Sequence, residues 1–308
     1  MPNRVALFME RASNPYMQQV EAEAVAEGAA RGLAVECHFA DNRFLQIQQL
    51  YSVIRAAQNR PEGIAVFPAH DDSLGRVARA ALETGMDWIS LHRRAGDLEA
   101  LQREFPKNAV TLVGPDQLEI GRLQGRLARA AAPGGRVLYV QGSQINASAA
   151  QRLQGFREVV DPGRDIVGIV DGNWTAEDTQ MSVQRWMHVM MPSIGQVDVV
   201  VCQNDLMAVG AKTALEEATS SSLARFDTTR TPVIGCDGLP GQGRRLVDEG
   251  KLKATVVIRD VGRRAVRVVA DRLRGQMPTS AVVLAPQPYP LLAEEPETPQ
   301  RLRPVRTA

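Results

Sequence analysis

Short runs of β-branched and other apolar residues alternate along this chain with longer stretches whose apolar residues recur every three to four positions. The short runs are typical of buried strands, and the longer stretches are typical of amphipathic helices. Regular alternation of the two favours parallel strands joined by helical crossovers. The sequence therefore predicts an α/β fold.

The strand pattern falls into two series of similar length. The first series comprises residues 5–8, 34–38, 63–67 and 88–91, and the second comprises residues 110–113, 136–140, 165–170, 197–202 and 232–235. A chain of 308 residues is also long enough to split into two domains, since cores tend to divide at about 100 to 200 residues. We therefore predict two lobes, each built on a doubly wound parallel sheet.

The net charge argues against nucleic acid as a partner, and the placement of histidines and cysteines argues against a metal site. Lys and Arg number 36 against 35 Asp and Glu, so a net charge of +1 provides no general attraction for nucleic acid. The three cysteines and four histidines are scattered, with no cluster at metal-ligand spacing. We expect no metal site and no bound cofactor.

Sequence signatures of common enzymes are also missing. There is no GxSxG nucleophile elbow, no Walker phosphate loop and no HExxH motif. Gly241-Gln242-Gly243 is followed by Arg-Arg-Leu where a dinucleotide loop would have its third glycine, and it follows a turn and not a strand. We predict no catalytic residues and no enzymatic activity.

Polar and aromatic residues gather just after predicted strands or near helix starts. In doubly wound sheets ligands bind outside the carboxyl ends of the strands, and Asp, Asn and Arg side chains there can hydrogen-bond paired hydroxyls while aromatic rings stack on sugar C–H faces. The predicted ligand-binding residues are Asn14, Tyr16, His92, Arg93, Arg152, Trp174, Asn204 and Asp237. Their common placement predicts a cleft for a small hydroxyl-rich molecule.

Each of these residues also has a purely structural interpretation. Asn14, Asp72, Asp116, Thr175 and the Asn204-Asp205 pair can cap helices. Arg152 could form a surface ion pair, Tyr16 and Trp174 could pack in a core, and Asp237 could shape a turn. His92 could be a loop residue without a ligand role.

Four stretches carry a family resemblance. They are Ser13-Asn14-Pro15-Tyr16, NASAAQRLQGF at 146–156, QNDLMAVGAKTAL at 203–215 and GCDGLPGQGRRLVDEGKLKATV at 235–256. With them the chain resembles the ribose-type periplasmic sugar-binding proteins and the related effector-binding cores of LacI-type repressors. The resemblance covers nearly all of residues 4–290.

The resemblance implies roles for individual residues. Asn14 and Tyr16 match a hydrogen-bonding Asn and a stacking aromatic in the first loop, Arg93 and Arg152 match one arginine from each lobe, Trp174 matches an aromatic wall, and Asn204 and Asp237 match the polar pair that holds ring hydroxyls. Three positions depart from the family pattern: His92 replaces an Asp, Ile258 replaces a Gln, and Glu10 replaces a small hydroxyl residue. We therefore expect a ligand other than ribose: another sugar, a polyol or a less hydroxylated molecule.

The resemblance also implies a periplasmic binding protein type I arrangement, with three chain crossings between the lobes. We expect them near residues 114–116, 236–238 and 258–260. The implied lobes are 1–114 plus 259–283 and 115–258 plus 284–293, followed by a flexible tail at 294–308 that is rich in Pro and charge. Hinge closure around the ligand is the expected mechanism.

The leading functional hypothesis is a solute receptor of an ABC transporter or membrane sensor. Its partners would be the small ligand and the transporter permease or sensor, with no membrane insertion. A second hypothesis is the effector core of a LacI-type regulator without its DNA-binding region, so this chain alone would not bind nucleic acid, and a remote third is a small-molecule enzyme. We expect a periplasmic location if a leader was removed, and a cytoplasmic one if the sequence is complete, since no signal peptide pattern precedes the first strand.

Overall fold

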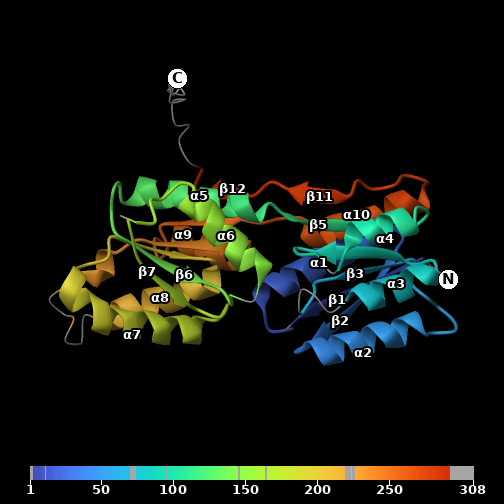
Figure 1. Ribbon diagram of the computed structural model, residues 1–308, viewed down its shortest axis with the longest axis horizontal. Helices are drawn as coiled ribbons and strands as arrows, with labels where there is room; N and C mark the ends of the chain where they lie inside the picture. The colour runs from blue at the N-terminus through green and yellow to red at the C-terminus, as the bar shows by residue number, and fades with distance from the viewer. Residues whose placement is uncertain are drawn as a thin grey trace, which may run out of the picture.

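Two α/β lobes lie side by side in the computed structural model (Figure 1). The structure describes residues 3–10, 12–69, 74–94, 96–144, 146–163, 165–218, 223 and 226–291. Each lobe is built on a six-stranded sheet. The predicted fold class, two doubly wound lobes, is confirmed, whereas Asp72 and the predicted tail at 294–308 lie outside the described residues.

The first lobe has the strand order β11-β5-β4-β3-β1-β2, with every neighbouring pair parallel. Its strands are β1 (Arg4–Glu10), β2 (Ala34–Ala40), β3 (Gly63–Val66), β4 (Asp87–Leu91), β5 (Val110–Pro115) and β11 (Ala281–Leu284). Helices α1 (Pro15–Arg31) and α10 (Val261–Leu273) cover one face. The other face is covered by α2 (Arg43–Ile54), α3 (Gly75–Glu83) and α4 (Leu98–Glu104).

The second lobe repeats this plan with the order β12-β10-β9-β8-β6-β7. Its strands are β6 (Val137–Gln141), β7 (Ile166–Asp171), β8 (Val199–Cys202), β9 (Val233–Asp237), β10 (Ala254–Val257) and β12 (Gln287–Tyr289), of which β12 alone is antiparallel to its neighbour. Helices α5 (Gln117–Ala131) and α6 (Ala147–Arg157) cover one face, and α7 (Ala176–Ile194) and α8 (Asp205–Ala218) the other. The shorter helical segments are η1 (Thr228–Arg230), η2 (Pro240–Arg244) and α9 (Arg245–Asp248).

Strand β1 illustrates why an unbroken apolar run forms a central strand. Successive side chains of a strand point to opposite faces. Val5 and Leu7 accordingly pack into the core beneath α1 and α10, whereas Ala6 and Phe8 pack into the core beneath α2 and α3. Both faces are covered, so burial of each large side chain stabilises the lobe by about 1.5 to 3 kcal/mol.

Three predicted helix caps are confirmed. The side chains of Asn14, Asp116 and Thr175 accept backbone N–H groups of Tyr16, Glu119 and Asp178 at 2.9, 2.9 and 3.1 Å. Each cap follows a strand directly or within a few residues, so it fixes the point at which the chain turns from strand to helix.

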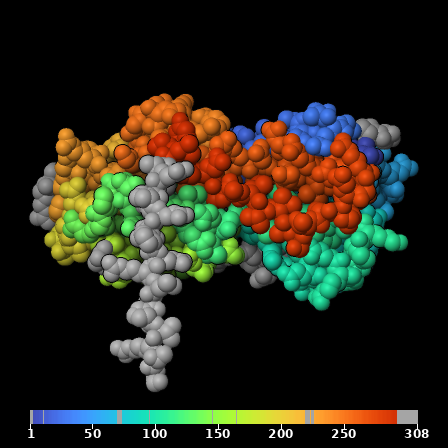
Figure 2. Space-filling model, turned by 90° about the horizontal axis from the view of Figure 1, so that it is seen from above, coloured from blue at the N-terminus to red at the C-terminus, as the bar shows by residue number. Residues whose placement is uncertain are grey.

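The chain crosses between the lobes three times. The crossings are at residue 116, between β5 and α5; at 258–260, between β10 and α10; and at 285–286, between β11 and β12. Figure 2 shows the orange and red residues of the last part of the chain lying over both lobes. The predicted crossing at 236–238 is wrong, because β9 and β10 on either side of it are neighbours in one sheet.

Within the described ranges, no helix combines the length and the apolar character needed to span a membrane.

Candidate ligand-binding cleft

A cavity of about 230 Å³ lies between the lobes. The sheets share one strand order, β2-β1-β3-β4-β5 in the first lobe and β7-β6-β8-β9-β10 in the second. In sheets of this order the ligand crevice forms outside the carboxyl ends of the strands. All eight residues predicted from the sequence line the cavity. They are Asn14, Tyr16, His92 and Arg93 from the first lobe and Arg152, Trp174, Asn204 and Asp237 from the second.

Asn14 and Tyr16 occupy the start of α1. Asn14 caps the helix through its side-chain oxygen, so its amide nitrogen remains available to the cavity. The Tyr16 ring is only 7% exposed, and burial together with the negative charge of Asp237 raises the pKa of its hydroxyl well above the usual value. Tyr16 is therefore a neutral phenol at any physiological pH. Helix capping and cavity lining coexist in Asn14.

His92 lies directly after β4 and is 7% exposed. Its ring meets Tyr16 edge-on and Phe67 at a tilt, with centroids 5.2 and 4.9 Å away. Its Nε2 lies 2.5 Å from the Tyr16 hydroxyl. Burial lowers the pKa of His92 well below its usual value, and the nearby cations Arg152 and Arg93 lower it further. The imidazole is thus a neutral, fixed part of the cavity wall.

Arg93 is held in place by its own lobe. Its guanidinium pairs with Glu10, donates from Nε to the Pro68 carbonyl at 2.9 Å, and lies over the Phe67 ring at 5.1 Å. Glu10 departs from the family pattern, and its contact with Arg93 explains the departure: the Glu10 carboxylate neutralises the Arg93 guanidinium, whose residue is only 7% exposed. A paired arginine presents a fixed donor geometry without a net charge.

Arg152 projects from α6 into the cavity and is 4% exposed, so it is not a surface ion pair. Its Nε donates to the Gln117 side-chain oxygen at 2.8 Å, and one terminal nitrogen donates to the Gln203 carbonyl at 2.5 Å. The same guanidinium lies 5.7 Å from the Trp174 ring. These contacts orient the remaining donors toward the ligand space.

Trp174 and Asn204 form one corner of the second lobe. The indole lies against Gly142, where any Cβ atom would be 2.1 Å from the ring, and its buried Nε1 has no hydrogen-bond partner among the described residues. Asn204 accepts the Met207 N–H at 2.8 Å, and its amide nitrogen reaches the Trp174 carbonyl only at 3.4 Å. Both side chains keep donor capacity for a ligand.

Asp237 ends β9 and is partly exposed to the cavity. In the described part of the chain its carboxylate has no hydrogen-bond partner. Burial and the nearby carboxyl of Asp205 raise the pKa of Asp237 well above the usual value, against the opposing effect of Arg152. An unpartnered acceptor in such a site is suited to ligand hydroxyls.

Asp205, the second member of the Asn204-Asp205 pair named as a possible helix cap, does not line the cavity. It is fully buried behind the site, where it accepts the Gly238 N–H at 2.8 Å and the Thr255 hydroxyl at 2.7 Å. Burial raises its pKa to about 7. Asp205 therefore fixes the turn that carries Asp237, and it does so from beneath the cavity wall.

Backbone strain concentrates at the cavity. Among the described non-glycine residues, six have positive φ, and four of these line the cavity: His92 (63°), Asn173 (48°), Trp174 (64°) and Asp237 (106°). L-residues rarely adopt such angles, at a cost of order 1–3 kcal/mol each, and they cluster at functional sites. The cavity is therefore a built site and not a packing defect.

Other cavity residues escaped the sequence analysis. They include Phe67, Ser143, Ser148 and Asn173. Phe67 is the last residue of the predicted strand 63–67, and Asn173 directly precedes Trp174. Both therefore lie at strand ends, the criterion by which the other residues were predicted. Gln117, which contacts both His92 and Arg152, gave no such signal because it begins a helix directly after a capping Asp.

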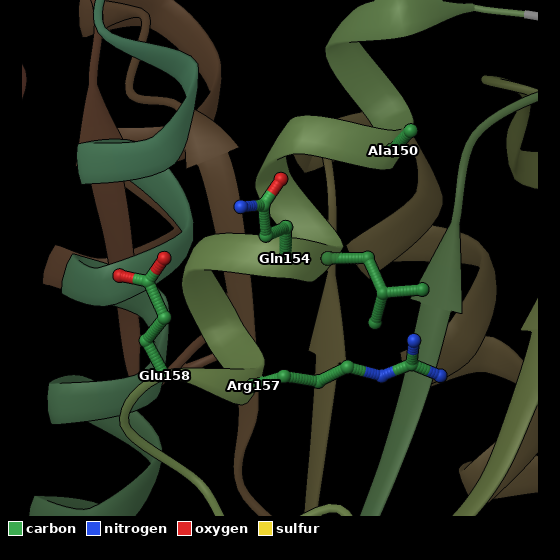
Figure 3. Close-up of a pocket in the computed structure, with 5 residues that line it drawn as sticks. Ala150, Gln154, Arg157 and Glu158 are labelled. Atoms are coloured by element: carbon green, nitrogen blue, oxygen red, sulfur yellow. The ribbon is translucent and has the colours of Figure 1, made fainter.

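A second hollow lies on the outer side of α6 and is separate from the cleft. It is lined by Ala150, Leu153, Gln154, Arg157 and Glu158, a stripe at helical spacing (Figure 3). In Figure 3 the labelled side chains spread to both sides of the helix, and Glu158 pairs with Arg122 of α5. None of the predicted ligand-binding residues lines it.

Sequence comparison places this architecture among known proteins. The family model of the periplasmic binding protein domain matches residues 5–277. The D-ribose/D-allose-binding protein of Pseudomonas aeruginosa is 26% identical over 257 residues, covering 82% of this chain and 76% of that protein. The ribose import binding protein of Escherichia coli is 24% identical over 275 residues, covering 88% and 85%. These relatives are binding proteins.

Solved structures agree with the fold. The myo-inositol binding protein of Caulobacter, bound to myo-inositol, has a TM-score of 0.77 at 25% identity, covering 92% of each chain. A periplasmic solute binding protein of an ABC transporter from Actinobacillus succinogenes, with bound D-allose, has a TM-score of 0.79 at 21% identity, covering 93% of this chain and 96% of that one. The resemblance noted in the sequence is confirmed: this chain belongs to the periplasmic binding protein domain family, of the ribose type.

Proposed function

We propose that this protein captures a sugar or polyol in the interlobe cavity and presents it to an ABC importer. One observation carries the proposal: side chains from both lobes, at strand ends far apart in the sequence, line one cavity. Relatives that bind ribose, allose and myo-inositol support the ligand class. The pairing of Arg93 with Glu10 neutralises the charge of the first lobe's arginine, which suits an uncharged guest.

The mechanism follows from the crossings. Two lobes joined by three chain segments can bend about those segments while sliding little. A guest that contacts one lobe gains hydrogen bonds to the other only when the lobes approach. It therefore shifts the population toward the closed form.

We further propose that the bound molecule is released unchanged, and that the partner is a permease or a membrane sensor that reads the closed form. The relatives are binding proteins, which supports a receptor over a catalyst. We propose a periplasmic site of action, which is the location named by the family. Incubation with each sugar followed by chromatography would reveal any conversion, and conversion would contradict the receptor.

A thermal-shift and calorimetry screen with D-ribose, D-allose, myo-inositol and xylitol tests the ligand class. A ligand at 100 times its Kd adds about 2.7 kcal/mol to the free energy of unfolding. Asp237→Asn removes the charged acceptor, and loss of hydrogen bonds to a charged group corresponds to about a 10- to 150-fold higher Kd. The free protein should keep its melting temperature, because this carboxylate bonds to no described residue.

Asp161→Asn is the matched control, since Asp161 is an exposed loop residue that does not line the cavity. It should bind the screened sugar like the unaltered protein. Equal affinity of Asp237→Asn and Asp161→Asn would exclude this cavity as the site.

A further inference from the structure

A chain of hydrogen-bonded side chains joins the two lobes along the cavity wall. Arg152 Nε lies 2.8 Å from Gln117 Oε1, Gln117 Nε2 lies 3.5 Å from His92 Nδ1, and His92 Nε2 lies 2.5 Å from the Tyr16 hydroxyl. Arg152 and Gln117 belong to the second lobe, whereas His92 and Tyr16 belong to the first. The central link spans the crossing between β5 and α5.

The direction of every bond in this chain is fixed by Arg152. A guanidinium can only donate, so the Gln117 atom that faces it must be the amide oxygen. The amide nitrogen then faces His92, and because it also only donates, His92 Nδ1 must carry a lone pair. A neutral imidazole with a lone pair on Nδ1 has its proton on Nε2.

The last link determines what Tyr16 offers to a ligand. If His92 Nε2–H donates to the Tyr16 oxygen, the Tyr16 O–H cannot be directed at His92. No described residue other than His92 is hydrogen-bonded to the Tyr16 hydroxyl, and Tyr16 lines the cavity. The proton is therefore free to point into the ligand space. With the opposite tautomer, the Tyr16 O–H would donate to His92 Nε2 and would not be available to a ligand.

We propose that Gln117 is a specificity-determining positioning residue: it sets the tautomer of His92, so that Tyr16 acts as a hydrogen-bond donor and the ligand presents an acceptor oxygen to it. The acceptor is a ring ether, carbonyl or hydroxyl oxygen. This inference rests on the proposed ligand-binding function of the cavity. It gives the two ends of the site different chemistry, since Tyr16 donates at one lobe and the Asp237 carboxylate accepts at the other.

Nitrogen-15 NMR of the histidine rings tests the inference in the unliganded protein. The chain has four histidines, and His92→Gln identifies the signals of the one in question. We expect His92 to carry its proton on Nε2. A proton on Nδ1 in the unaltered protein would overturn the proposal, whether or not any sugar binds, so its failure is distinct from failure of the proposed function.

Gln117→Glu is the sharpest variant because it retains the shape of the side chain and the acceptor for Arg152. Its second carboxylate oxygen can only accept from His92 Nδ1, so the proton should move to Nδ1 and the Tyr16 O–H should turn to His92. Gln154→Glu, an exposed change on the outer side of α6, is the control and should leave the His92 signals unchanged. An unchanged His92 tautomer in Gln117→Glu would contradict the proposal.

A double-mutant cycle connects the tautomer to binding. With a sugar that binds in the screen, Tyr16→Phe and Gln117→Glu should each raise the Kd about 2- to 10-fold, the effect of losing one neutral hydrogen bond. The double variant should be no weaker than the weaker single variant, because both changes remove the same bond. Unchanged affinity in Tyr16→Phe, or fully multiplicative losses in the double variant, would overturn the proposal.

Discussion

Asp237 combines two costly features at one position. Its φ of 106° is strained for a residue with a side chain, and its carboxylate is turned toward a cavity without a partner in the described structure. Such features persist only when the surroundings enforce them, here through the buried Asp205 that holds the next backbone N–H. A ligand hydroxyl would supply the missing hydrogen bond.

Ligand binding should release protons through Asp237. Its pKa is raised in the free protein, and hydrogen bonds from ligand hydroxyls favour the ionised form. We therefore expect the affinity to rise with pH through the range in which Asp237 titrates. Calorimetry in buffers of different ionisation enthalpy measures the released protons, and an equal release in Asp237→Asn would assign it to another group.

His92 should make folding stability fall on acidification. The unfolded chain binds a proton at this residue near pH 6.5, whereas the folded protein resists it because the pKa is lowered. The unfolded state thus binds more protons below pH 6.5 than the folded state. As the pH falls, His92 lowers the free energy of unfolding by about 1.4 kcal/mol for each pH unit until its pKa in the folded protein is reached.

Urea unfolding between pH 7 and pH 5 tests this contribution. His92→Gln should show a shallower decline of the free energy of unfolding than the unaltered protein. The groups that face the ring are Tyr16, Phe67, Gln117, Arg93 and Arg152, and the carboxylates of Glu10 and Asp237 lie in the same cavity. Identical slopes in the two proteins would show that His92 is not held neutral.

The residues of the site were predictable where position alone determines function. Asn14, Asn204 and Asp237 follow strands whose apolar runs are visible in the sequence, so their place at the sheet edge could be inferred. Gln117 could not be inferred, because its role arises only where the first crossing brings α5 against His92. The relation of Glu10 to Arg93 likewise could not be inferred, because it depends on β1 and β4, which are far apart in the sequence and lie on either side of β3 in the sheet.

At the scale of elements, helix pairs approach closely at glycines. Gly262 at the start of α10 would place a Cβ atom 1.9 Å from the Val20 carbonyl oxygen of α1. Glu23 of α1 also accepts the Gly262 N–H at 3.2 Å, so this contact fixes the helix that follows the second crossing. The α1–α10 contact is thus part of the support of the hinge.

Gly262→Ala should lower the free energy of unfolding by about 1–3 kcal/mol, the usual cost of overpacking. Gly241→Ala is the matched control, since no atom lies within 4 Å of its added methyl group. Denaturant midpoints measure both. A Gly262→Ala midpoint equal to that of the control would show that α10 can move away from α1 without loss.

Three strands that the sequence did not predict are short. Strands β10, β11 and β12 have four, four and three residues, too few for a periodic pattern. The false crossing at 236–238 has a different origin, because it was placed from the family resemblance and not from the residues themselves. Only strand pairing, which joins β10 to β9, shows that the chain stays in the second lobe there.

For the whole molecule, ligand binding should reduce the overall dimensions. Residues of both lobes line the cavity, so we expect the proposed guest to favour the closed form. Small-angle X-ray scattering should show a smaller radius of gyration with a saturating sugar, and a smaller change for Asp237→Asn at the same concentration, because its higher Kd lowers the occupancy. An identical radius for the free and bound protein would indicate a cavity that is already closed without ligand.

The three crossings also have a consequence for synthesis on the ribosome. The first lobe receives α10 and β11 only after the chain has passed through β10, because residues 261–284 come late. By that time the second lobe has every strand except β12. The lobe that contains the N-terminus is therefore completed by residues near the C-terminus. We expect the second lobe, formed by the middle of the chain, to reach its native form before the first lobe does.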